Sequence, residues 1–128
     1  MSKFSDYLEE KILESTLRGA SFPSISTAYL GIFTADPTDA DSATEVNWTG
    51  YARQAMSFGA PAGGQSSIDT QIQFPALVGS SVTASHIGIY DAASSGNLLY
   101  HTSLQNSKNL TEDDVLSFAV GGVTVALD

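Results

Sequence analysis

The amino-acid sequence predicts a mostly-β fold: an antiparallel β-sandwich of the jelly-roll or Ig-like kind, with about seven strands and one N-terminal α-helix. Apolar residues recur with a helical period only as far as residue 18, and with a period of two from residue 26 onward. No helical pattern lies between the strands, which disfavours a βαβ fold. The 128 residues contain no evident linker or repeat. We therefore expect one domain, 1–128, with a helix at 5–18 and a sandwich at 26–128.

The helix predicted at 5–18 is amphipathic. Ser5 or Asp6 can cap its first turn, and Gly19 suits the left-handed position that follows a helix. A helix this short is marginal alone in water, so its apolar stripe is expected to cover the sandwich or a neighbouring subunit. The stripe consists of Phe4, Leu8, Ile12, Leu13 and Leu17.

The first predicted strand, 27–34, has apolar residues on both faces. Leu30 and Ile32 alternate with Tyr29 and Phe33, so both faces are expected to be covered. Further strands are predicted at 51–58, 68–74, 82–91, 98–104, 115–120 and 123–127.

The segments between these strands are rich in turn-forming residues. Residues 35–44, 59–67 and 105–114 are predicted to be loops, and 92–97 a hairpin turn. Gly121 and Gly122 indicate either a tight turn or a bend in one long strand. In the strand after the hairpin, one face is expected to hold Leu98, Tyr100 and Leu104.

The charge is strongly acidic and unevenly distributed. The net charge is −9, and residues 19–128 hold ten acidic side chains against Arg53 and Lys108. Nucleic-acid binding requires a basic surface, so nucleic acid is excluded as a partner, and anionic membranes are disfavoured for the same reason. No apolar run is long enough for a membrane span. The absence of cysteine excludes disulfides and thiol chemistry.

The residues that could support catalysis or metal binding do not form a recognisable motif. His86 and His101 are predicted to lie across one hairpin, but a zinc site would need further ligands that the spacing does not supply. The acidic clusters at 36–41 and 112–114 lack the pattern of a calcium loop and are interpreted as solvated turns. We expect no catalytic residue, no metal site and no cofactor.

Two further residues are candidates for an interface. Arg53 is predicted either to pair with an acid of its own chain such as Glu45 or to contact an acidic neighbouring subunit. Trp48 is predicted either to cover one end of the sandwich or to be exposed as an anchor for a partner or a saccharide.

Five segments together resemble a family of small virion structural proteins of tailed bacteriophages. The segments, which run in order along the chain, are SDYLEEKILESTLRG, STAYLGIFTADPTD, EVNWTGYARQAMSFG, SHIGIYDAASSGNLLYHTSL and VLSFAVGGVTVALD. The resemblance is to tail fibre-like proteins and to cement proteins on the outside of phage heads. It offers no catalytic residue to carry over to this chain.

The resemblance implies a non-enzymatic virion protein made in the cytoplasm of the bacterial host. The leading hypothesis is a head decoration or cement protein that binds between capsomers. Its expected partners are further copies of itself, in a trimer, and other virion proteins such as the major capsid protein. The alternatives are a tail or fibre-attachment module, a carbohydrate-binding domain that uses Trp48 and exposed tyrosines, and a small hydrolase.

Overall fold

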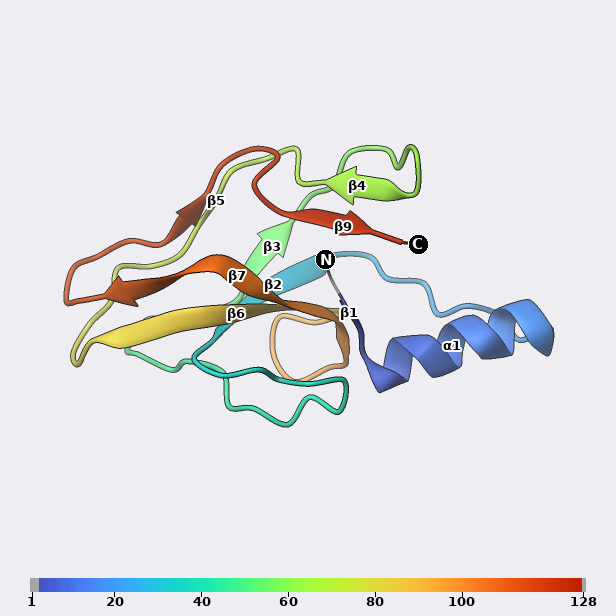
Figure 1. Cartoon of the computed structure of the whole chain (residues 1–128), viewed down its shortest axis with the longest axis horizontal. Helices are drawn as coiled ribbons and strands as arrows, with labels where there is room; N and C mark the ends of the chain where they lie inside the picture. Colours follow the sequence, from blue (N-terminus) through green and yellow to red (C-terminus); the bar gives the residue numbers. More distant parts are fainter. Residues whose placement is uncertain (1–2, 128) are drawn as a thin grey trace.

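The computed structural model describes residues 3–127, and its largest element is a five-stranded antiparallel sheet (Figure 1). The strand order is β1-β7-β6-β2-β3, from β1 (Lys3–Phe4), β7 (Leu98–Leu110), β6 (Val82–Tyr90), β2 (Ala28–Phe33) and β3 (Gln54–Met56). One helix, α1 (Asp6–Leu17), precedes β2 within the described range. The predicted mostly-β antiparallel fold with an N-terminal helix is confirmed.

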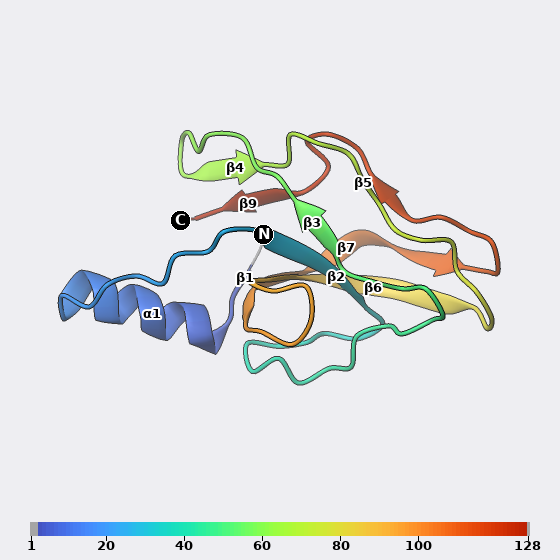
Figure 2. The same cartoon turned by 180° about the vertical axis from the view of Figure 1, so that it is seen from behind.

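The second layer consists of two short ribbons instead of one continuous sheet. One ribbon pairs β4 (Gln65–Ser67) with β9 (Thr124–Ala126), and the other pairs β5 (Ile72–Gln73) with β8 (Ser117–Phe118). Both ribbons lie on the same side of the large sheet in Figures 1 and 2. The arrangement is therefore sandwich-like, with a broken second layer.

Two apolar clusters lie on opposite faces of the large sheet. Leu30 and Ile32 of β2 belong to the main core, which the ribbons cover with residues such as Ile72 and Phe74. Phe33 belongs to a smaller cluster with Tyr90 and Leu98 on the other face. The alternation along β2 therefore predicts the two faces correctly.

A β-bulge changes the facing of residues at the start of β7. Tyr90 pairs with Leu98, but Ile89 pairs with Tyr100, so Leu99 is an extra residue in β7. Leu98 consequently joins the small cluster, while Tyr100 packs against the main core. The prediction that Leu98, Tyr100 and Leu104 share one face is wrong for Leu98, because strict alternation does not survive a bulge.

Two segments predicted as loops contain strand residues. Gln65–Ser67 form β4, and β7 continues through residues 105–110, although most of these side chains are polar and exposed. Their pairing depends on backbone hydrogen bonds to β9 and β6, which leave no apolar pattern in the sequence. The predicted 51–58 strand shrinks to Gln54–Met56, and Phe4, predicted on the helix, lies in β1.

The chain turns at Gly121 and Gly122 to pass from one ribbon to the other. Gly121 has a φ of +78°, and the N–H of Gly122 donates to the carbonyl of Ala119 at 2.7 Å. This geometry is a tight turn, the first of the two predicted alternatives.

The helix begins at a cap that also joins it to the sheet. The Ser5 hydroxyl oxygen accepts a hydrogen bond from the N–H of Leu8 at 3.1 Å and donates to the carbonyl of Leu98. Gly19, with a φ of +73°, follows the helix as predicted. Figure 1 shows α1 extending away from the sheet.

No helix within residues 3–127 has the length and apolar character needed to cross a bilayer.

Gly88 is predicted to be intolerant of a side chain. A Cβ at this position would lie 2.9 Å from Leu98 Cδ1 and 3.0 Å from Phe33 Cε1, inside the small cluster. We expect Gly88→Ala to lower the free energy of unfolding by about 1–3 kcal/mol, measured by urea denaturation. Gly59→Ala is the matched control, because its Cβ would meet only Ser67 O at 3.8 Å. Equal effects of the two substitutions would contradict this account of the packing.

Candidate interface and the Arg53 network

Arg53 forms an ion pair with Glu45 inside its own chain. Its Nε lies 3.0 Å from Glu45 Oε1 and 3.2 Å from Oε2, and its Nη2 lies 3.0 Å from Oε1. Two charged partners in this forked geometry interact more strongly than neutral hydrogen-bond partners. Of the two alternatives predicted for Arg53, the structure therefore contains the internal pair with Glu45.

The same guanidinium also joins the β6–β7 turn. Nη1 donates to the carbonyls of Ala92 at 3.0 Å and Ser95 at 2.8 Å, and Cζ lies 3.5 Å from the centre of the Tyr90 ring. The side chain is only 9% exposed. A contact between Arg53 and a neighbouring subunit stays a prediction, but most of its surface is already covered by its own chain.

The partner Glu45 fits against the sheet because residue 31 has no side chain. A Cβ at Gly31 would lie 2.6 Å from Glu45 Oε2. The Tyr51 hydroxyl donates to the same carboxylate and accepts a hydrogen bond from the N–H of Ile32 at 3.1 Å. Burial, together with the Glu45 hydrogen bond, raises the pKa of Tyr51 well above its usual range, so the phenol stays a neutral donor.

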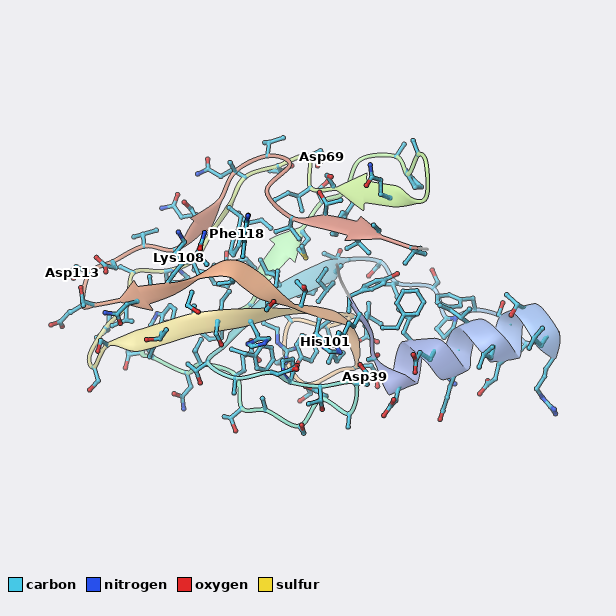
Figure 3. All side chains as sticks on the ribbon, in the orientation of Figure 1. Asp39, Asp69, His101, Lys108, Asp113 and Phe118 are labelled. Carbon is cyan, nitrogen blue, oxygen red and sulfur yellow. The ribbon has the colours of Figure 1, made fainter. Side chains whose placement is uncertain are left out.

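The two histidines lie on neighbouring strands, as predicted, but contact different groups. His86 of β6 lies opposite Phe33 of β2, and His101 of β7 lies opposite Gly88 of β6. Both histidines are therefore on the face of the small cluster. His86 Nδ1 lies 2.8 Å from Ser85 Oγ. His101 is buried, with Nε2 at 2.7 Å from Asp39 Oδ1 and Nδ1 at 3.5 Å from Asp36 Oδ1. Figure 3 shows His101 and Asp39 near the start of α1.

The aspartates of the 36–41 segment do not converge on one point. Asp36 accepts a hydrogen bond from the N–H of Thr38 at 2.9 Å, which lowers the pKa of its carboxyl group. Asp39 faces His101, and Asp41 accepts from the Tyr90 hydroxyl at 2.7 Å. Asp36 therefore stabilises the turn of the loop and lies near His101, which Asp39 contacts, whereas Asp41 holds the loop to Tyr90.

A separate acidic group lies where the helix meets this loop. One oxygen from each of Asp6, Glu9 and Asp39 lies within 4.8 Å of the other two. All three carboxylates are exposed, and Asp39 already contacts His101. Exposed acids at a helix N-terminus are also expected from the helix dipole, so this group does not by itself indicate a metal site.

Trp48 covers the edge of the main core. Its ring packs edge-on against Tyr51 with centroids 5.1 Å apart, and Tyr51 stacks on Phe74 at 5.9 Å. Its Nε1 is buried and has no hydrogen-bond partner within the described chain. The structure thus contains the predicted covering role, and the indole N–H is not presented to a partner.

The predicted apolar stripe of the helix divides into a covered base and an exposed tip. Leu8 is 3% exposed and Ile12 is half-buried, whereas Leu13 is 55% and Leu17 is 76% exposed. Phe4, outside the helix, packs edge-on against Tyr100 at 5.5 Å. We define residues 6–27, which are α1 and the segment that returns to β2, as the arm.

An apolar groove opens at the end of the sandwich where the arm begins. We call it the end groove; it has a volume of about 430 Å³ and lies between the large sheet and the β4–β9 ribbon. Within residues 3–127, no charged side chain lines it. Its lining includes Ile25, Ala28, Phe58, Tyr100, Val125 and Leu127. Sequence reasoning missed this feature, because its residues come from strands far apart in the chain.

Comparison with known proteins gives one family match. The model of the family described as Podophage GP4 fiber I protein gp80 matches residues 3–126, which is nearly the whole chain. A search of curated proteins gave no match.

Replacement of Arg53 is predicted to destabilise the monomer. Arg53→Met keeps most of the apolar stem but removes the cation that pairs with Glu45 and the donor to two carbonyls, so we expect the free energy of unfolding to fall by about 1–3 kcal/mol in urea denaturation. Lys108→Met is the matched control. It removes the other cation of residues 19–128, which is exposed and lies near the far end of the molecule from α1 (Figure 3). We expect it to change stability by less than about 0.5 kcal/mol. Similar losses in both variants would show that the effect is one of net charge.

Proposed function

This chain belongs to the Podophage GP4 fiber I protein gp80 family, and we propose that it is a fibre subunit that helps to build or attach a tail fibre of a tailed-phage virion. The observation that carries the proposal is the match over residues 3–126, since it covers both the arm and the β-sandwich. Membership of the family makes the chain a structural virion component.

The alternative within the same virion is a head decoration or cement protein. The family description favours a fibre, and the fold of residues 3–127 does not favour an icosahedral position over a tail position. The projecting arm supports a role in joining subunits, which either location requires. A fibre location is therefore our proposal, and capsid cement is the alternative that the experiment below tests.

We propose that the chain acts without catalysis. The His101–Asp39 and Tyr90–Asp41 contacts hold the 34–46 segment to the sheet, and His86 contacts the hydroxyl of the adjacent Ser85. A carbohydrate-binding role built on Trp48 loses its main support, because that ring packs on Tyr51 and the core. The proposed partners are further copies of this chain and other virion proteins. The proposed place of synthesis is the cytoplasm of the bacterial host.

Copy number and position in the particle test the proposed location. Tails have low-order symmetry, so we expect at least about tenfold fewer copies of this chain than of the major capsid protein in purified particles. Quantitative staining or mass spectrometry measures the ratio, and gold-labelled antibodies show the position. A copy number comparable with the capsid protein, with label over the head, would establish cement instead.

Loss of both histidines is predicted to affect stability but not a chemical activity. His86→Gln with His101→Gln should leave particle assembly and infectivity intact at permissive temperature. We expect a loss of about 1–3 kcal/mol in the free energy of unfolding, because buried His101 contacts Asp39. The single variants are the controls and should assign most of the loss to His101. A folded double variant that assembles normally but is not infectious would argue for a chemical role.

A further inference from the structure

The tip of the arm exposes an apolar surface that residues 3–127 of its own chain do not cover. Leu13 and Leu17 on α1 are largely exposed, and Phe22 on the returning segment is 43% exposed. The base of the same helix is buried at Leu8. Helices of this length depend on packing of their apolar face, so the tip has the character of a surface that is covered in the assembled state.

The direction of the arm is fixed at its base. The N–H of Ser5 donates to the carbonyl of Leu99 at 2.9 Å, and the N–H of Asp6 donates to the carbonyl of Asp39 at 2.9 Å. The Ser5 hydroxyl adds its bond to Leu98. Both views show α1 leading away from the sheet and the ribbons (Figures 1 and 2). The tip therefore cannot turn back into the end groove of its own chain without breaking these bonds.

The end groove has the properties that the tip requires. It is lined mainly by apolar side chains, with Gln65 and Ser66 as polar members, and no charged residue among 3–127 lies in its wall. Its volume of about 430 Å³ falls in the range of pockets that enclose a ligand of several apolar groups. Leu127, at the groove, is itself 47% exposed, so the groove also offers apolar surface to a partner.

Charge favours another copy of this chain as the partner. Residues 19–128 carry a net charge of −8, so two β-sandwiches repel each other on average. The distal half of α1 and its C-cap, residues 11–18, hold Lys11 and Arg18 against Glu14, a net charge of +1. The tip is thus the part of the arm that can approach an acidic sandwich without repulsion.

We infer that the apolar tip of the arm, around Leu13 and Leu17, inserts into the end groove of a second copy of the chain. Each copy supplies one tip and one groove, so reciprocal or cyclic exchange leaves neither surface unmatched. This inference deepens the proposed function and rests on it, because a fibre requires copies to be joined.

The first experiment measures the oligomeric state of the purified full-length chain by sedimentation and light scattering over a range of concentrations. The wild-type chain is expected to self-associate. Leu17→Asp at the tip and Leu127→Asp at the groove should each raise the dissociation constant by about tenfold or more, since each places a charge in an apolar contact. Val120→Asp is the matched control, with the same added charge at a residue that is 64% exposed and outside both surfaces. It should leave association unchanged.

Single substitutions are preferable to deletion of residues 1–18. The deletion would also remove β1, which pairs with β7, and the Ser5 contacts. Leu17 and Leu127 are exposed enough that their replacement should leave the monomer folded, which circular dichroism can verify.

The second experiment locates the contact with introduced cysteines. The natural sequence has no cysteine, so a short bifunctional maleimide can join only introduced thiols. A mixture of Leu17→Cys and Leu127→Cys chains should give cross-linked pairs of one chain of each kind. A mixture of Leu17→Cys and Val120→Cys chains should give far fewer.

Three outcomes would overturn the inference. These are a wild-type chain that stays monomeric at high concentration, tip and groove variants that associate like the wild type, and cross-linking that does not distinguish Leu127 from Val120. None of these depends on where the protein sits in the particle. A head location with self-association through the tip would refute the proposed fibre role but not the tip-to-groove contact. A monomeric chain located on a tail would refute the tip-to-groove contact but not the fibre role.

Discussion

A guanidinium that is removed from water must be paired, because an uncompensated charge inside a protein costs several kcal/mol. Arg53 satisfies this requirement with the Glu45 carboxylate and the carbonyls of Ala92 and Ser95. Its side chain thereby links the segment before β3 to the β6–β7 turn. Glu45 in turn depends on the missing side chain of Gly31. This ion pair, together with the Asp39–His101 and Asp41–Tyr90 contacts, holds the 34–46 segment against a sheet face that neither of the two ribbons covers.

The placement of that segment determines where the helix begins. With Glu45 held on the sheet, Asp39 reaches both the buried His101 and the N–H of Asp6. Ser5 closes the same junction with bonds to Leu98 and Leu99. The base of the arm is thus attached to the sheet and to the loop, and the arm extends from a firm support. The side chains of His101 and Asp39 therefore have a structural role at this junction.

The two sides of the large sheet are covered by different means. On one side, two ribbons bury a broad core; on the other, a loop covers the three residues Phe33, Tyr90 and Leu98. The broken second layer leaves the end groove open, and the arm starts at the same end. A chain that exposes both an apolar helix tip and an apolar groove is well suited to repeated assembly, and its acidic sandwich limits association through other surfaces.

The sequence by itself determined the elements whose residues signal locally. The cap at Ser5, the glycine after the helix, the alternation in β2 and the hairpin at 92–97 were readable, because each depends on neighbours in the chain. The pairing of Arg53 with Glu45 was one of two predicted alternatives. The charge of Arg53 predicts an acidic partner, but it does not show whether that acid belongs to the same chain or to a neighbouring subunit. Tertiary structure alone decided the exposed strand 105–110, the bulge at Leu99, the covering position of Trp48 and the end groove. These features arise from backbone pairing and from contacts between distant segments, and neither leaves a periodic pattern of side chains.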